Sequence, residues 1–300
     1  MPIEDVATEL VVRYLDAWVP TSLHSSKRVT FVQSWPRIAN PGAAEAVVRV
    51  FNEFADQLRG RRVSLAFIAP ELGDAATRLS ALQVELDTPS QLAVHAVTGS
   101  AATHLAAVLA ASQSAGAPIL AYIDVTLDEL PVRAIAAGRP AEVLMLAAHG
   151  SHDTHAGILR DNGFTLVSTV ELVTEDDARL LVFGTSSAKS LEAFKNGLWQ
   201  LDEYAGVSIR DPHDKDGHLL DISLSPHPGP LRRQILDHLA AVGERNVTEI
   251  RRFALTETVY RVSDVTQVLT NLVTSGAVTR RPEHGRLSGD TMIGPVLASR

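Results

Sequence analysis

Polar side chains that could hold a nucleotide cofactor follow four predicted strands. The strands cover residues 29–32, 63–68, 92–97 and 118–124, and the side chains are Gln33, Ser34, Glu71, Ser100 and Asp124. In an open parallel sheet the ligand crevice lies beyond the carboxyl ends of the strands. A nucleotide cofactor would need an acid there to bind the ribose and a polar group to contact the base. These residues, with Gly42 in the first loop, are the predicted cofactor-binding set, and Asp124 is the candidate catalytic acid if the protein is active.

The turn after the first strand is unusual for such a site. Residues 29–42 read "VTFVQSWPRIANPG", with no glycine before Gly42. A nucleotide cofactor needs a tight turn with few side chains there, so that the backbone can approach it closely. Trp35, Pro36 and Arg37 would instead fill that space. The segment is either a nucleotide site of unusual composition or the remains of one.

The elements that position these residues alternate between helix and strand over residues 1–224. Apolar strand-like runs are separated by helical patterns of about 10–15 residues, which indicates βαβ units. We therefore predict an α/β domain over 1–224, with a Rossmann-like, doubly wound and mainly parallel sheet. Residues 202–230 are rich in Gly, Pro, Asp and His and are interpreted as a linker.

Residues 225–300 predict a second, smaller domain. Helical segments at 231–242, 247–255 and 263–275 precede a hairpin over residues 277–294. Three helices followed by a hairpin are the outline of a winged helix-turn-helix. Ser263 is the predicted N-cap of the third helix.

The predicted recognition helix and wing differ in charge. The helix offers Asp264, Thr266, Gln267 and Asn271 but no Lys or Arg, whereas base-reading helices usually carry Arg or Lys as well. The wing supplies Arg280, Arg281 and Arg286, which could contact phosphates. Protein docking or a structural role is therefore preferred for this domain, and nucleic-acid binding is an alternative.

Composition sets outer limits on function. Of 300 residues, 45% are hydrophobic and 21% are charged, which is ordinary for a folded globular chain. The absence of cysteine excludes disulfides, thiolate catalysis and cysteine metal sites. No apolar run is long enough to span a bilayer, and the N-terminus lacks signal-peptide features, so we expect a cytoplasmic protein with no membrane partner. The net charge of −8 divides into −11 over residues 1–224 and +3 over 225–300, so only the C-terminal part could approach a polyanion.

Other clusters are weaker candidates for chemistry. His149, His152 and His155 recur at three-residue intervals, and a metal site there is conceivable, but the flanking Gly and Ser favour a loop. The segment "DPHDKDGHLLD" resembles a calcium loop, yet Pro212 and Ser223 occupy two ligand positions, so a polar turn is preferred. Asp128 and Glu129 are interpreted as the start of a helix, where its dipole favours acids. No metal site is predicted.

Residues 180–206, "LLVFGTSSAKSLEAFKNGLWQLDEYAG", resemble the three-Cys-motif partner proteins (TcmP). Further segments match the family in the same order along the chain, namely "TELVVRYLDAWVP", "VTFVQSW", "NPGAAEAVV", "AFIAPELGDAATRL", "LAYIDVTLDELP" and the terminal "VTEIRRFALTETVYRVSDVTQVLTNLVTSGAVT". The resemblance covers nearly the whole chain. It implies a methyltransferase-like Rossmann domain with a winged-helix tail, in a family named for its association with another protein.

The chain departs from the family pattern at the cofactor crevice. Gln33 and Ser34 stand where the family shows Asp and Gly, and Ala69 stands where it shows Glu. Ser100 replaces an acid, and only Asp124 is retained, followed by Val125 and Thr126 in place of Pro and Phe. Each missing charge-assisted hydrogen bond is worth about 1.5–3 kcal/mol.

We therefore expect a degenerate methyltransferase fold that binds no cofactor and acts as a non-catalytic partner or scaffold for another protein. The main alternative is an enzyme, an S-adenosylmethionine-dependent methyltransferase or other catalyst with an altered site. The third is a nucleic-acid-binding module that uses the wing arginines.

Overall fold

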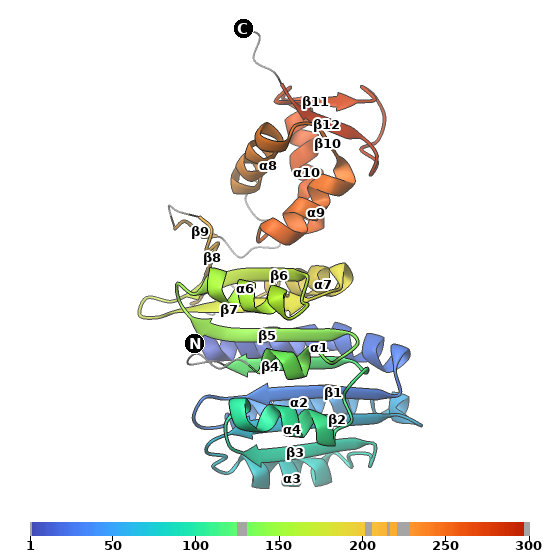
Figure 1. Cartoon of the computed structure of the whole chain (residues 1–300), viewed down its shortest axis with the longest axis vertical. Helices are drawn as coiled ribbons and strands as arrows, with labels where there is room; N and C mark the ends of the chain where they lie inside the picture. Colours follow the sequence, from blue (N-terminus) through green and yellow to red (C-terminus); the bar gives the residue numbers. More distant parts are fainter. Residues whose placement is uncertain (1, 125–130, 202–205, 215–216, 221–228, 297–300) are drawn as a thin grey trace.

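The computed structural model describes residues 2–124, 131–201, 206–214, 217–220 and 229–296. Within them a nine-stranded sheet runs in the order β3-β2-β1-β4-β5-β7-β6-β8-β9 (Figure 1). Its strands are β1 Arg28–Ser34, β2 Arg62–Ala69, β3 Leu92–Thr98, β4 Ile119–Asp124, β5 Ala141–Ala148, β6 Leu166–Val173, β7 Ala178–Thr185, β8 Ser208–Arg210 and β9 Leu219–Leu220. The first five strands in this order are parallel and β7 runs antiparallel to both its neighbours. The expected α/β class with a mainly parallel central sheet is confirmed.

Helices cover both faces of the sheet, which explains why its central strands are apolar on both sides. One face packs against α1 Ile3–Ser25, α2 Pro41–Glu53, α3 Ala75–Glu85 and α7 Ala188–Leu198. The other packs against α4 Ala101–Ala111, α5 Val132–Ile135 and α6 His152–Asp161. A short 3₁₀ helix, Ala55–Leu58, follows α2.

The strand order reverses at β1, which pairs with β2 on one side and with β4 on the other. Ser34, the last residue of β1, is level with Ile68 and Ile123 in its two neighbours. The carboxyl ends of three strands therefore meet at one edge. This is the topological switch point where open α/β sheets bind ligands.

The C-terminal part is built from three helices and a small antiparallel sheet. In chain order its elements are α8 Gly229–Val242, β10 Arg245–Asn246, α9 Val247–Glu257, α10 Val262–Thr274, β11 Val278–Arg281 and β12 Met292–Pro295. The sheet has the order β10-β12-β11. A capping box starts α9, where Asn246 and Glu249 each accept a hydrogen bond from the other's backbone N–H.

Two local predictions are wrong. The segment interpreted as a linker contains β8 and β9, which extend the sheet beyond β6 because their backbone groups find antiparallel partners there. Ser263 is not the N-cap of the third C-terminal helix. The helix already includes Val262, so its N-cap is Arg261. The side chain of Asp264 accepts a hydrogen bond from the backbone N–H of Arg261.

Among the described residues, no helix is long and apolar enough to cross a membrane.

Candidate functional site

The crevice between β1 and β2 is closed by the chain's own backbone. Beyond the end of β1, Ile38 forms a parallel bridge with Glu71. The N–H of Ala39 donates to the carbonyl of Glu71 at 2.9 Å, and the N–H of Glu71 donates to the carbonyl of Arg37 at 2.9 Å. The predicted cofactor loop is therefore an extension of the sheet, and the backbone of Glu71 is occupied within it.

Trp35 covers the end of β2. The backbone N–H of Trp35 donates to the carbonyl of Ile68 at 3.0 Å. The indole ring of Trp35 stacks on Phe67 with ring centroids 6.3 Å apart. The ring packs against a small apolar cluster that includes Ala69 and Ala75. In a functional site a ribose would lie near this position, but Ala69 offers no side-chain acceptor. The space holds apolar side chains of the protein itself.

Gly42 belongs to a helix rather than to a cofactor turn. It lies in the first turn of α2, and Asn40 caps that helix by accepting a hydrogen bond from the N–H of Ala43 at 3.1 Å. A Cβ added at Gly42 would meet Asn40 Oδ1 at 3.5 Å, an ordinary contact. A larger side chain would therefore fit at position 42.

Ser100 acts as a helix cap. Its Oγ accepts a hydrogen bond from the N–H of Thr103 at 3.3 Å and lies 2.9 Å from Thr103 Oγ1. This satisfies a backbone donor at the start of α4. The hydroxyl is thus engaged in local structure.

Gln33 and Ser34 carry buried polar atoms without partners. Gln33 is 0% exposed and Ser34 is 1% exposed. Both amide atoms of Gln33 and the Oγ of Ser34 lack a hydrogen bond among the described residues. Such groups are costly to bury, so their presence at the switch point is the feature of this crevice that most favours an altered ligand site.

Replacing Gln33 with methionine should therefore raise the free energy of unfolding by about 1 kcal/mol, since the variant keeps the side-chain length and removes an unpartnered amide. Urea denaturation of both proteins measures the change. Asn40→Ala is the contrasting control, because it removes a polar group that has a partner and should lower stability by about 1 kcal/mol. A Gln33→Met protein less stable than the wild type would show that the amide has a partner in solution.

Asp124, the retained acid, is held in an ion pair. Arg179, the second residue of β7, places one guanidinium nitrogen 2.6 Å from Asp124 Oδ1 and another 3.0 Å from Glu4 Oε1. The same side chain donates to the backbone carbonyls of Leu146 and Ala147. Burial raises the pKa of Asp124, and the charge and hydrogen bond of Arg179 oppose this rise. The carboxylate is thus bound by a cation of the protein.

Arg179 was not predicted as a site residue. In the sequence it follows the acidic segment "TEDDA" and precedes an apolar run. A single arginine in that position does not by itself indicate a functional site. Because β7 is antiparallel, its first residues reach the edge where the parallel strands end. Val125, Thr126, Asp128 and Glu129 lie outside the described residues.

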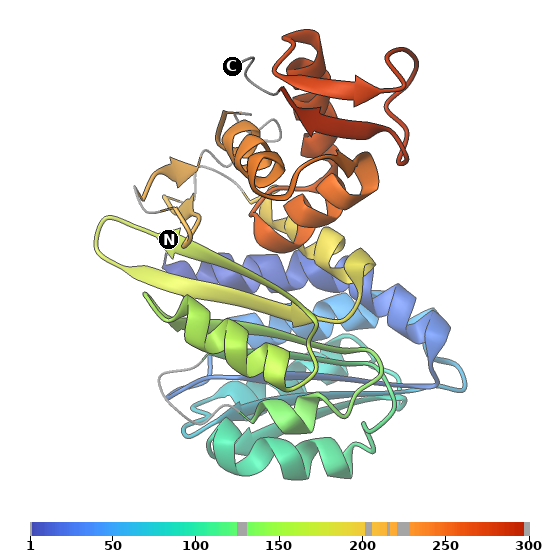
Figure 2. The ribbon, with the colours of Figure 1, turned by 45° about the horizontal axis from the view of Figure 1, so that its top comes forward.

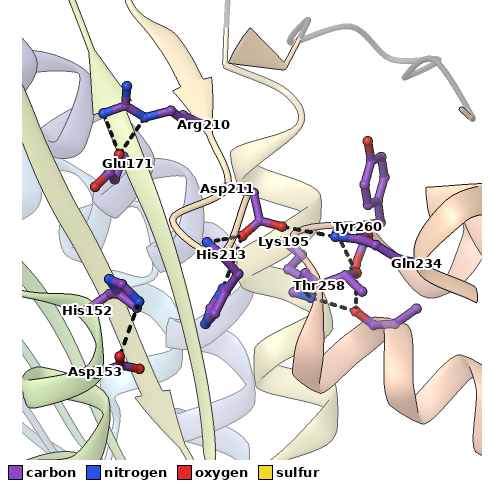
Figure 3. A network of polar contacts seen from close by, with 11 residues as sticks. His152, Asp153, Glu171, Lys195, Arg210, Asp211, His213, Gln234, Thr258 and Tyr260 are labelled. Carbon is purple, nitrogen blue, oxygen red and sulfur yellow. Dashed lines mark hydrogen bonds and ion pairs between the residues drawn. The ribbon is translucent and has the colours of Figure 1, made fainter. Parts of the chain in front are cut away.

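A second polar cluster lies where the sheet meets the C-terminal part (Figure 3). Glu171 in β6 is buried and binds Arg210 of β8 at 2.6 Å and His149 at 2.6 Å. Asp211 accepts hydrogen bonds from His213 and from Gln234 of α8. The side-chain hydrogen bond to Asp211 raises the pKa of His213.

The three histidines after β5 do not form a loop cluster. His152 and His155 lie in the first turns of α6, where Asp153 is favourable for the helix dipole, so the loop interpretation is wrong for them. His149 contacts Glu171, His155 bonds to the carbonyl of Ser151, and the ring of His152 lies against that of His213 at 5.2 Å. In the described part of the chain, no three His, Asp or Glu residues are arranged to hold a metal ion. In the calcium-like segment the N–H of Gly217 donates to the carbonyl of Asp214 at 3.1 Å, and Asp216 lies outside the described residues.

Lys195 joins the two parts of the chain. It lies in α7, is 0% exposed, and donates from Nζ to three backbone carbonyls at the end of α9 (Figure 3). The acceptors are Ala254 at 3.1 Å, Thr258 at 2.5 Å and Tyr260 at 3.1 Å. Free carbonyls and the helix dipole make such a terminus a favourable place for a cation. Burial nevertheless lowers the pKa of Lys195 to about 7.

Trp199, the C-cap residue of α7, adds to this contact. Its Nε1 donates to the carbonyl of Val259 at 3.1 Å, and its ring stacks on Tyr260 with centroids 5.6 Å apart. Figure 2 shows α7 (yellow) beside the orange helices of the C-terminal part. The segment that carries the strongest family resemblance thus supplies the contact between the two parts of the chain.

The wing arginines are mostly engaged within the protein. Arg280 donates to the carbonyls of Pro282 and Gly285 and so closes the turn after β11. Arg281 forms a two-point ion pair with Glu244. Arg286 makes no ion pair with a described residue, and it lines a groove of about 300 Å³ together with Arg251 and Thr270. Only part of the predicted phosphate-binding set is therefore available.

Comparison with known proteins assigns the chain to no family. No family model matches the chain, and no curated protein matches it. Among solved structures, the chain is similar to a spermidine synthase in complex with the transition-state analogue AdoDATO, with a TM-score of 0.33, 10% identity, and 62% of each chain covered. It is likewise similar to spermidine synthase from Thermotoga maritima, with a TM-score of 0.33, 11% identity, and 62% and 63% of the two chains covered. The likeness spans less than two thirds of either protein.

Proposed function

We propose that this chain is a divergent three-Cys-motif partner protein, whose methyltransferase-like crevice is closed and which acts as a non-catalytic partner or scaffold for another protein. The observation that carries the proposal is the pairing of residues 37–39 with Glu71 beyond the ends of β1 and β2, beside the switch point. Where a cofactor would approach the backbone, the backbone is already bonded to itself.

Cofactor entry would require several contacts to break together. The two backbone bonds at Glu71 contribute about 0.5–1.5 kcal/mol each, and Trp35 would have to leave Phe67 and the apolar cluster behind it. Ala69 and the capped Ser100 supply no replacement for the bonds that a nucleoside needs. Asp124 could act on a substrate only after release from Arg179.

The order of the C-terminal elements, α8-β10-α9-α10-β11-β12, supports a winged-helix assignment. Its third helix, α10, carries no Lys or Arg, and two of the three wing arginines are engaged. Both features favour a docking role for this part over base recognition. Binding of nucleic acid at Arg251 and Arg286 is the alternative, and it would show as a mobility shift that weakens steeply with salt.

Calorimetric titration with S-adenosylmethionine tests the proposal. We expect no saturable heat with ligand up to about 1 mM, since two or three lost hydrogen bonds weaken a micromolar site by orders of magnitude. Trp35→Ala is the companion variant, because it vacates the crevice without restoring an acceptor at Ala69, and it should also fail to bind.

A micromolar dissociation constant for the wild type would instead support the enzyme alternative, to which the unpartnered atoms of Gln33 and Ser34 already point. In that case Gln33→Met should weaken binding. Such a result would contradict the non-catalytic role.

A further inference from the structure

The outer side of β3 is a free edge of the central sheet. In the chain as described, no strand pairs with it, although β2 pairs along the whole length of β3. The carbonyl of Gln91 and the N–H of Gly99 both bond to β2. The backbone N–H and C=O groups of successive residues point to alternate sides of a strand. The groups of the odd-numbered residues of β3 therefore point to β2, and those of Val94 and Ala96 point outward.

A groove of about 610 Å³ lies beside this edge, between β3 and α4. Most of its lining is small and apolar, including Ala93, Val97, Val108 and Ala111, but the exposed Arg62 at the start of β2 also lines it. His95, in the middle of β3, is exposed within it. In Figure 1 this edge lies at the end of the sheet opposite to the C-terminal part, so that part leaves the edge uncovered.

Strand β3 itself carries none of the usual features that prevent strand pairing, although Arg62 of the neighbouring β2 brings one positive charge to the groove. Residues 88–123, which include β3 and α4, contain no Asp, Glu, Lys or Arg, although 21% of the whole chain is charged. Natural edge strands are usually protected by charges, proline, a bulge or a covering element. Residues 1–224, which form the central sheet and its helices, carry a net charge of −11, so two copies of this part repel one another. The segment 88–123 adds nothing to that repulsion, and the positive charge of Arg62 beside it reduces it.

We propose that β3 pairs with β3 of a second copy of this chain, so that one sheet continues through both subunits. Two-fold symmetry makes the two strands antiparallel. With the axis at His95, the outward groups of Val94 in one subunit bond to those of Ala96 in the other. The backbone N–H and C=O groups of His95 point to β2, so the two copies of His95 face each other as a non-hydrogen-bonded pair. Side chains lie close together in such a pair. The interface is independent of whether the cofactor crevice binds a ligand.

Analytical ultracentrifugation of the full chain tests this arrangement. The wild type should sediment at twice the mass of one chain, and His95→Glu should weaken dimerisation by at least about tenfold, because like charges then meet across the axis. Ala111→Glu, which places a charge in the groove from α4, should act in the same direction. His24→Glu makes the same charge change at an exposed position at the end of α1 and should leave the dimer intact.

A mixing experiment tests the pairing itself. His95→Glu and His95→Lys should each be monomeric alone and should form a mixed dimer together, because opposite charges then face one another. Far-ultraviolet circular dichroism confirms that each variant is folded. A monomeric wild type, a His95→Glu dimer as tight as the wild type, or a mixture that stays monomeric would each overturn the proposal.

Discussion

Replacing Lys195 with methionine should lower the free energy of unfolding by about 3–4 kcal/mol. Methionine fills a similar volume but leaves the carbonyls of Thr258 and Tyr260 buried without this donor, at about 1–3 kcal/mol each. The carbonyl of Ala254 keeps a bond from Thr258 Oγ1 at 2.7 Å. Urea denaturation followed by tryptophan fluorescence measures the loss, because Trp199 lies in the same contact.

Lys189→Met is the matched control for this substitution. Lys189 lies in the same helix but is exposed, so its replacement should change stability by less than about 0.5 kcal/mol. An equal effect of the two substitutions would show that the carbonyls at the end of α9 do not depend on Lys195.

The difference in stability between the wild type and Lys195→Met should depend on pH. Burial lowers the pKa of Lys195 to about 7 from 10.5, so between these values the unfolded state binds more protons than the folded state. Wild-type stability therefore gains a rising contribution with pH in this window, which Lys195→Met lacks. The difference in stability between the two proteins should be larger at pH 9 than at pH 6.

The sheet was predictable because its signal is local. Apolar runs such as residues 63–68 and 119–123 are buried on both faces, and composition alone marks such strands. Strands β8 and β9 escaped prediction because they are only three and two residues long and depend on tertiary pairing, β8 with β6 and β9 with β8. Their sequence carries turn residues, and tertiary pairing decides their structure.

The candidate site was less predictable, because its decisive contacts join distant segments. Bulky side chains after β1 predicted an obstructed crevice, and Trp35 does pack there. The backbone closure at Glu71 has no side-chain signature, since it depends on how two loops meet. The partners of Lys195 are carbonyls, which every residue has. A basic residue in a helix is ordinarily read as solvated.

Two basic side chains, the buried Lys195 and the partly buried Arg179, bear on the proposed function. Lys195 fixes the C-terminal part on α7, and Arg179 fixes α1 and β7 at the carboxyl edge through Glu4 and Asp124. Both positions use the side-chain N–H donors of a basic residue to hold elements of the protein together. A protein that presents a fixed surface to a partner needs such contacts more than it needs a mobile crevice.

Replacing Arg179 with methionine should lower the free energy of unfolding by about 3 kcal/mol at pH 7. Asp124 is 9% exposed at its side chain, and without its cation the carboxylate would be buried and unpaired. Denaturant titration of the wild type and the variant gives the value. Arg13→Met is the control, because Arg13 pairs only with Glu9 on the same helix at a half-exposed position and should contribute less than about 1 kcal/mol.

The pH dependence of Arg179→Met separates loss of this ion pair from a general packing defect. Burial already raises the pKa of Asp124, and loss of the arginine removes the groups that oppose the rise. The folded variant then binds more protons than the unfolded chain above pH 3.8, so its stability falls as the pH rises. The deficit should be smaller at pH 4.5 than at pH 7, and Asp124→Asn added to Arg179→Met should restore part of it. A deficit that is constant with pH would mean that the carboxylate was never held by Arg179, and Asp124 would again be a candidate for catalysis.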